Sequence, residues 1–131
     1  MVRGLKVALF VYGVLQALLG IAFIFVPVWV GTMFGFTEVA DLAAYLVTML
    51  GGGLVAAAFL LILTGLDPLG NTLGLKFAIV WSALGAVTQL YSMSQGIVSF
   101  GQAGVGTILD AIFALIFLFL YPWRQEQTQK T

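Results

Sequence analysis

Long apolar stretches separated by short polar segments form the main pattern of this chain. Three of these stretches, residues 7–37, 42–66 and 77–109, contain no charged side chain. The third stretch is too long for a single membrane-spanning helix, which needs about 20 mostly apolar residues, and the polar, glycine-containing run 94–104 divides it. The pattern therefore predicts four transmembrane helices, at about 7–26, 42–63, 75–93 and 103–121.

Residues that begin or end helices lie at the predicted boundaries. Pro27 follows the first apolar run and is expected to end or kink that helix. Thr37, which is followed by acidic residues, is expected to cap the second helix, and Pro122 is expected to stop the fourth. Between the first two helices, the aromatic-rich segment 27–36 predicts a short piece at the membrane interface rather than an aqueous loop.

The composition places this predicted bundle in lipid. Of the 131 residues, 62% are hydrophobic and 8% are charged, and the mean hydropathy is +1.14. A soluble domain carries about 25% charged residues, so this chain could not cover a water-exposed surface. We therefore predict one transmembrane domain over residues 1–131: an all-α, integral membrane four-helix bundle surrounded by membrane lipid.

Several kinds of chemistry are excluded by the residue types. The chain contains no cysteine and no histidine, which excludes disulfides, thiolate metal sites and histidine-ligated cofactors. Lys plus Arg number 5 and Asp plus Glu number 5, so no basic surface is available for nucleic acid. The sequence contains no nucleophile–base pair and no phosphate-binding loop. We therefore expect no catalytic residue, no metal and no cofactor.

The basic residues predict the orientation of the bundle. With four spans, all the basic residues fall on one side of the membrane: Arg3, Lys6, Lys76, Arg124 and Lys130. The connections on the opposite side contain no lysine or arginine. The positive-inside rule then predicts that both termini are cytoplasmic and that the protein is integral to the cytoplasmic (inner) membrane.

Small residues recur at helical spacing along each predicted helix. Lipid offers no hydrophobic drive for helices to associate, and small residues let helix backbones approach closely. We therefore expect packing through Gly13 and Gly20 in the first helix, Gly52 in the second and Gly85 in the third. The bulkier leucine, isoleucine and phenylalanine side chains lie largely off these faces and are expected to contact lipid.

One polar residue in each predicted helix lies at a similar depth. At about 1.5 Å per residue, Gln16, Gln89 and Asp110 lie roughly 15–20 Å from the cytoplasmic side, and Thr48 lies about 20 Å from it. The sequence therefore predicts a polar layer near the middle of the membrane, made of these four residues. We expect the Gln16 and Gln89 amides to donate hydrogen bonds to Asp110.

Two roles for Asp110 stay open. An ionised carboxylate inside a membrane costs at least about 2.5 kcal/mol, so Asp110 should face the bundle and be protonated or hydrogen-bonded. In the structural interpretation, Asp110 is an adhesive that sets the register of the helices. In the functional interpretation, it is a protonation or ion site in a transport pathway. Such a pathway needs water access or a second titrating group, and the sequence places none nearby.

The segment Leu18–Pro27 leads into Gly31–Phe36, and the second predicted helix contains the glycine triplet 51–53. These features resemble the first hairpin of small DoxX-like membrane proteins, in which a glycine-containing helix ends at a proline and the next helix carries a glycine cluster. The resemblance is clearest over residues 1–65. It implies an integral four-helix protein that is often an accessory subunit, and some relatives are associated with membrane redox complexes. It transfers no catalytic residue to this chain.

The short predicted loops leave no room for a soluble catalytic domain. We therefore expect a non-catalytic accessory or assembly subunit, which docks on other membrane protein subunits or on copies of itself. The alternative is a small oligomeric transporter or channel that uses Asp110 together with Gln16 and Gln89.

Overall fold

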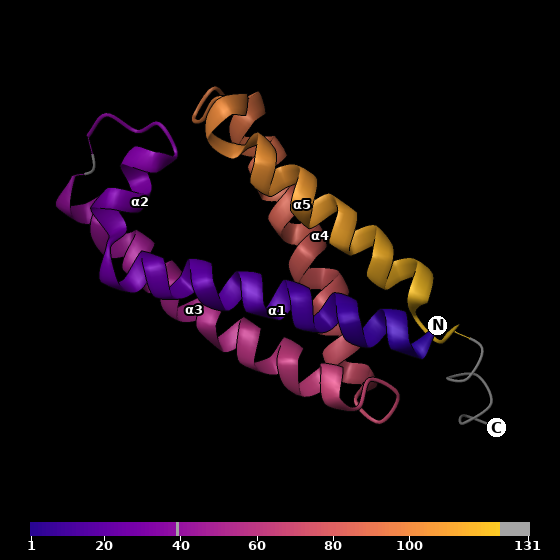
Figure 1. Ribbon diagram of the computed structural model, residues 1–131. Coiled ribbons are helices and arrows are strands. Elements are labelled where there is room, and N and C mark those ends of the chain that lie inside the picture. Colours follow the sequence, from indigo (N-terminus) through magenta and orange to yellow (C-terminus); the bar gives the residue numbers. More distant parts are fainter. Residues whose placement is uncertain (39, 124–131) are drawn as a thin grey trace.

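The computed structural model describes residues 1–38 and 40–123, and in these ranges every regular element is a helix (Figure 1). The elements are α1 (Val2–Phe25), α2 (Pro27–Met33), α3 (Asp41–Leu66), α4 (Thr72–Ser94) and α5 (Phe100–Leu120). Four of them are long and apolar enough to cross a membrane, with 24, 26, 23 and 21 residues. At about 1.5 Å per residue they measure roughly 32–39 Å, against a hydrocarbon core of about 30 Å. The predicted all-α four-helix membrane bundle is confirmed.

The observed helices extend beyond most of the predicted boundaries. The first begins at Val2 rather than at residue 7, and α3 ends at Leu66 rather than at residue 63. The charged residues marked the edge of the hydrocarbon region, but a helix does not need to end there. Its backbone bonds are internal, so it continues into the interface while Arg and Lys side chains reach the headgroups.

The segment after Pro27 forms a helix of its own. Pro27 is the first residue of α2, where its missing N–H costs nothing, and Val26 separates α2 from α1. Gly35 then turns the chain at a φ of 86°, a conformation that glycine adopts readily. The predicted cap at Thr37 is wrong: α3 begins at Asp41, whose acid lies in the first turn and suits the helix dipole.

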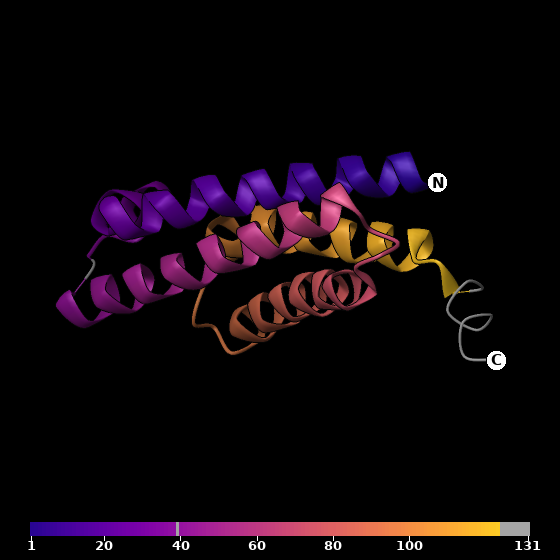
Figure 2. The same ribbon diagram turned by 90° about the horizontal axis from the view of Figure 1, so that it is seen from below.

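The four long helices pack as two pairs, α1 with α3 and α4 with α5 (Figures 1 and 2). The two pairs meet at the end of the bundle that carries the N-terminus, the α3–α4 turn and the end of α5. We call this the terminal end. From there the pairs diverge, and α2 with its following loop lies near the start of α5 (Figure 1). The Gln102 Nε2 atom donates a 3.4 Å hydrogen bond to the Gly35 carbonyl there.

The hydrophobic core lies toward the terminal end, where the pairs meet. It contains Leu5, Ala8, Leu9, Tyr12, Leu61, Leu75, Ala78, Phe113, Phe117 and Tyr121. All but Tyr121, which directly follows α5, belong to the first half of α1 and α4 and to the second half of α3 and α5, which are the halves nearest the terminal end. Away from this end, α1 and α3 continue to pack on each other while their contact with the other pair decreases.

Glycines allow the backbones of α1 and α3 to pack very close together. A Cβ atom added to Gly20 would lie 2.8 Å from the Gly51 carbonyl oxygen, and one added to Gly51 would lie 2.7 Å from the Gly20 carbonyl oxygen. Gly13 also faces α3, where an added Cβ would lie 2.9 Å from Ile62. The prediction for Gly52 is wrong, because it is exposed and has no neighbouring atom within 4 Å of an added Cβ. Gly51, the preceding residue, makes the contact instead.

Candidate functional site

Asp110 lies at the centre of α5 and accepts hydrogen bonds from two other helices. The Tyr12 hydroxyl of α1 donates to Asp110 Oδ1 at 2.7 Å, and the Gln89 amide of α4 donates to Asp110 Oδ2 at 2.8 Å. Ten residues separate Asp110 from each end of α5, which is about 15 Å of helix. The carboxyl group therefore joins the two helix pairs close to the middle of the span.

Gln89 is oriented by contacts on both sides of its carboxamide. Besides its bond to Asp110, Gln89 Nε2 donates to the Gly85 carbonyl at 3.0 Å, so both amide hydrogens have acceptors. Gln89 Oε1 lies 3.5 Å from the Thr107 hydroxyl, which also donates to the Ala103 carbonyl at 2.8 Å. We call Tyr12, Gln89, Thr107 and Asp110 the polar cluster.

Two glycines leave the space that the polar cluster occupies. A Cβ atom added to Gly85 on α4 would collide with Asp110 Oδ2, and one added to Gly106 on α5 would lie 2.6 Å from Gln89 Oε1. Gly85 therefore allows the Asp110 carboxylate to approach α4, and Gly106 allows the Gln89 amide to approach α5. Gly85 was predicted from the sequence as a packing residue, whereas Gly106 was not.

Tyr12 belongs to the polar cluster but was not predicted from the sequence. Its side chain is only 2% exposed, and its ring stacks on Phe113 at a centroid distance of 4.5 Å and meets Phe117 edge-on at 5.7 Å. Counting residues along a helix gives the depth of a Cα atom, but a tyrosine hydroxyl lies far from its own Cα. A tyrosine well inside an apolar span is itself a signal, because its buried hydroxyl requires a partner.

Gln16 and Thr48 do not join the polar cluster as predicted. Gln16 is 8% exposed, and its Oε1 atom has no hydrogen-bond partner among the described residues. The side-chain donors to Asp110 are Tyr12 and Gln89, so the predicted bond from the Gln16 amide to Asp110 is wrong. Tyr12, one helical turn earlier on α1, takes that place. Thr48 is half-buried and donates to the Ala44 carbonyl of its own helix at 3.0 Å. Its position on α3 places it in the pair that does not contribute the acid.

The polar cluster contains one acidic group and no basic group. Tyr12 and Gln89 donate one hydrogen bond each to Asp110, and within the described ranges no lysine or arginine is among its partners. Within residues 1–38 and 40–123, no group of three or more His, Cys, Asp and Glu side chains could hold a metal ion. Chemically, the arrangement is a carboxyl group held by neutral donors from two neighbouring helices.

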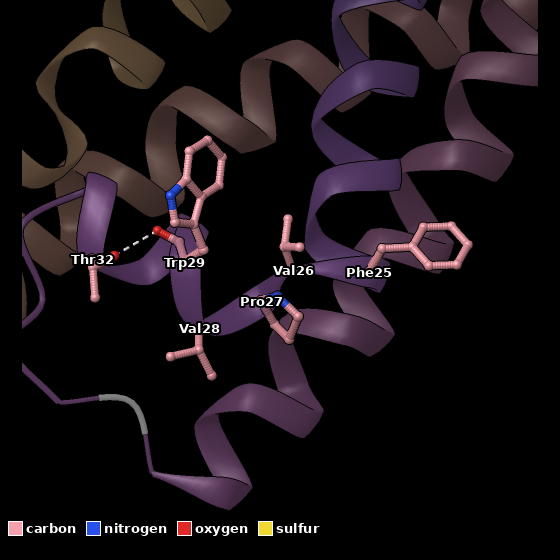
Figure 3. Close-up of a pocket in the computed structure, with 6 residues that line it drawn as sticks. All are labelled: Phe25, Val26, Pro27, Val28, Trp29 and Thr32. Atoms are coloured by element: carbon pink, nitrogen blue, oxygen red, sulfur yellow. Dashed lines mark hydrogen bonds between the residues drawn. The ribbon is translucent and has the colours of Figure 1, made fainter.

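A shallow hollow of about 530 Å³ lies at the corner between α1 and α2, lined by residues 25–29 and 32. Figure 3 shows that its side chains do not converge: the Phe25 ring points away from the Trp29 indole, and Val28 points away from both. The Thr32 hydroxyl is already used, because it donates to the Trp29 carbonyl at 2.7 Å. The exposed Phe25 and Trp29 suit a position at the membrane interface.

No family model, curated protein or solved structure shows significant similarity to this chain. The resemblance to DoxX-like proteins therefore stays a prediction.

Proposed function

We propose that this protein is a non-catalytic membrane subunit that associates with another transmembrane helix through the lipid-facing side of α3. One observation carries the proposal: Gly52 and Gly53 have no atom within 4 Å of an added Cβ, although they lie in the middle of α3. Ala56 is exposed one turn after Gly52. We call Gly52, Gly53 and Ala56 the glycine face.

The glycine face has the chemistry of a helix–helix interface in a membrane. Small residues four positions apart let two backbones approach closely, and close packing is the main force between helices in lipid. Facing lipid, the same glycines would expose backbone and would contribute little packing. The neighbouring Gly51, by comparison, is buried in a close contact between α3 and α1.

The state of Asp110 supports a structural role for the polar cluster. Both carboxylate oxygens already accept hydrogen bonds from the chain's own side chains. Those bonds connect α5 to α1 and to α4, so the acid helps to hold together the two helix pairs. A subunit whose polar groups stabilise its own fold has its lipid-facing surfaces free for association.

We also propose that the protein is located in the cytoplasmic membrane with both termini inside. The basic residues Arg3, Lys6 and Lys76 support this orientation, because they lie at the terminal end. Arg124 and Lys130, which the prediction also used, lie outside the described residues. The cysteine-free chain allows a direct test: a cysteine introduced at Thr72 should be labelled only from the cytoplasmic side, and one introduced at Gln95 only from the opposite side.

Association through the glycine face can be tested by co-purification from the native membrane in a mild detergent. The wild-type protein should be recovered with a partner, either another membrane protein or a second copy, and Gly52→Leu should lose that partner. Val105→Leu is the matched control, because Val105 is an equally lipid-facing position on α5. Recovery of the wild type as a solitary monomer, or equal behaviour of the two variants, would contradict the proposal.

One observation favours the second candidate, a small transporter or channel that uses Asp110. Among the described residues, Gln16 Oε1 is a buried acceptor without a donor. It lies one turn from Tyr12, and an ion or water pathway would use such an atom. In liposomes, a transporter of protons or monovalent cations should lose flux in Asp110→Asn while keeping its fold. Flux that is unchanged in both Asp110→Asn and Asp110→Leu would eliminate this candidate.

A further inference from the structure

A shallow, open groove lies between α1 and α5 at the terminal end of the bundle. Its volume is about 540 Å³. Val7, Ala8 and Val11 of α1 and Phe113 and Ile116 of α5 line it, and Arg3 lies at the end nearest the start of α1. This groove is separate from the glycine face, which lies on α3.

The dimensions of the groove match one leaflet of a bilayer. Its lining residues on α1 recur every four positions, so they share one face of the helix. From Arg3 to Val11 the groove runs about 12 Å along α1, which is less than half of a hydrocarbon core of about 30 Å. A transmembrane helix, about 10–12 Å across, would need a face that continues through the whole span. A single hydrocarbon chain needs only a shallow apolar groove in one leaflet.

The side chains of the groove are apolar except at its end. The Phe113 ring stacks on Tyr12, so an aromatic layer separates the groove from the polar cluster. At the other end, Arg3 is exposed and makes no ion pair or hydrogen bond with any residue in the part of the chain that the structure describes. An unpaired guanidinium at the membrane surface attracts anionic groups, and it is well suited to a phosphate.

We propose that the groove between α1 and α5 binds an anionic phospholipid, with one acyl chain between Val11 and Ile116 and the phosphate at Arg3. The apolar lining accounts for the acyl chain, and the position of Arg3 at the interface accounts for the headgroup charge. The hollow between α1 and α2 lacks this combination, because no charged residue lines it and its side chains diverge (Figure 3). The proposal is independent of any partner on the glycine face.

The proposal can be tested with the purified full chain in phosphatidylcholine vesicles that contain a trace of spin-labelled lipid. Electron paramagnetic resonance measures the fraction of labelled lipid that the protein immobilises. Spin-labelled phosphatidylglycerol should be preferred over spin-labelled phosphatidylcholine by about fivefold, the effect expected of one basic residue near the surface. Arg3→Gln should abolish this preference, and Arg3→Lys should retain most of it.

Two further variants separate the groove from general surface charge. Lys6→Gln removes an equal charge three residues from Arg3, and the Lys6 side chain does not line the groove. This variant should therefore lower the preference much less than Arg3→Gln does. Val11→Trp should fill the groove and lower the immobilised fraction of both lipids. Val11 is exposed, so the fold should be retained, as circular dichroism would verify. Equal losses in Arg3→Gln and Lys6→Gln, no preference in the wild type, or unchanged immobilisation in Val11→Trp would each overturn the proposal.

Discussion

The hydrogen bond between Tyr12 and Asp110 should contribute measurably to stability, and a double-mutant cycle can isolate that contribution. Tyr12→Phe removes only the hydroxyl that donates to Asp110 at 2.7 Å, and Asp110→Ala removes the acceptor. Hydrogen bonds between transmembrane helices contribute about 0.6 kcal/mol on average and about 1.7 kcal/mol at most. The Tyr12 side chain is 2% exposed and the bond is short, so we expect a coupling free energy in the upper half of that range.

The cycle is needed because the single variants combine several effects. Asp110→Ala also removes the acceptor of Gln89 and relieves the cost of a carboxyl group in lipid, and these contributions have opposite signs. Tyr12→Phe keeps the ring that stacks on Phe113. The coupling energy cancels every contribution that does not depend on both residues together.

The assay is reversible unfolding of the four proteins in mixed micelles with increasing sodium dodecyl sulfate, followed by circular dichroism. A second cycle, pairing Tyr12→Phe with Thr48→Val, is the control, because Thr48 bonds only within its own helix. The control pair should be additive within about 0.5 kcal/mol. A Tyr12–Asp110 coupling no larger than that of the control would refute the idea that this bond helps to hold the helix pairs together.

Three other predictions use the same unfolding measurement or hydrogen exchange. Gly51→Ala should lower the free energy of unfolding by about 1–3 kcal/mol, because the added methyl group meets the α1 backbone. Gly52→Ala should leave the free energy of unfolding unchanged or raise it by up to about 1 kcal/mol, because Gly52 has open space around it. Equal effects of the two variants would contradict the observed packing face of α3. Gln16→Leu should raise the free energy of unfolding by about 1–3 kcal/mol because it removes a buried, unpaired carbonyl oxygen, and a decrease would show that this oxygen has a partner in the membrane. Ser99→Ala removes the capping box at the start of α5 and should cost about 1 kcal/mol of local stability, seen as faster hydrogen exchange at Gln102; unchanged exchange would argue against the cap.

The polar cluster could be predicted from the sequence only in part. Gln89 and Asp110 were identified because polar residues deep in an apolar span are costly and therefore stand out. Their depths along separate helices also agreed, which is a property of residue counting alone. Tyr12 was missed, because counting along a helix does not say how far a side chain reaches or which neighbour it faces. Gln16 was identified as buried and polar, but its predicted partner was wrong for the same reason.

The membrane character of this protein, the number of its long helices and the presence of an acid within one of them could all be predicted from the order of its residues. These follow from the length of apolar runs and from the spacing of charges, which are properties of the linear chain. The side of each helix that packs, in contrast, becomes known from the arrangement of the folded helices. The three consecutive glycines of α3 point in directions about 100° apart, and each alone would permit a close contact. The choice of Gly51 over Gly52 depends on how α3 is rotated against α1, and that rotation is set by the packing of all the surrounding side chains.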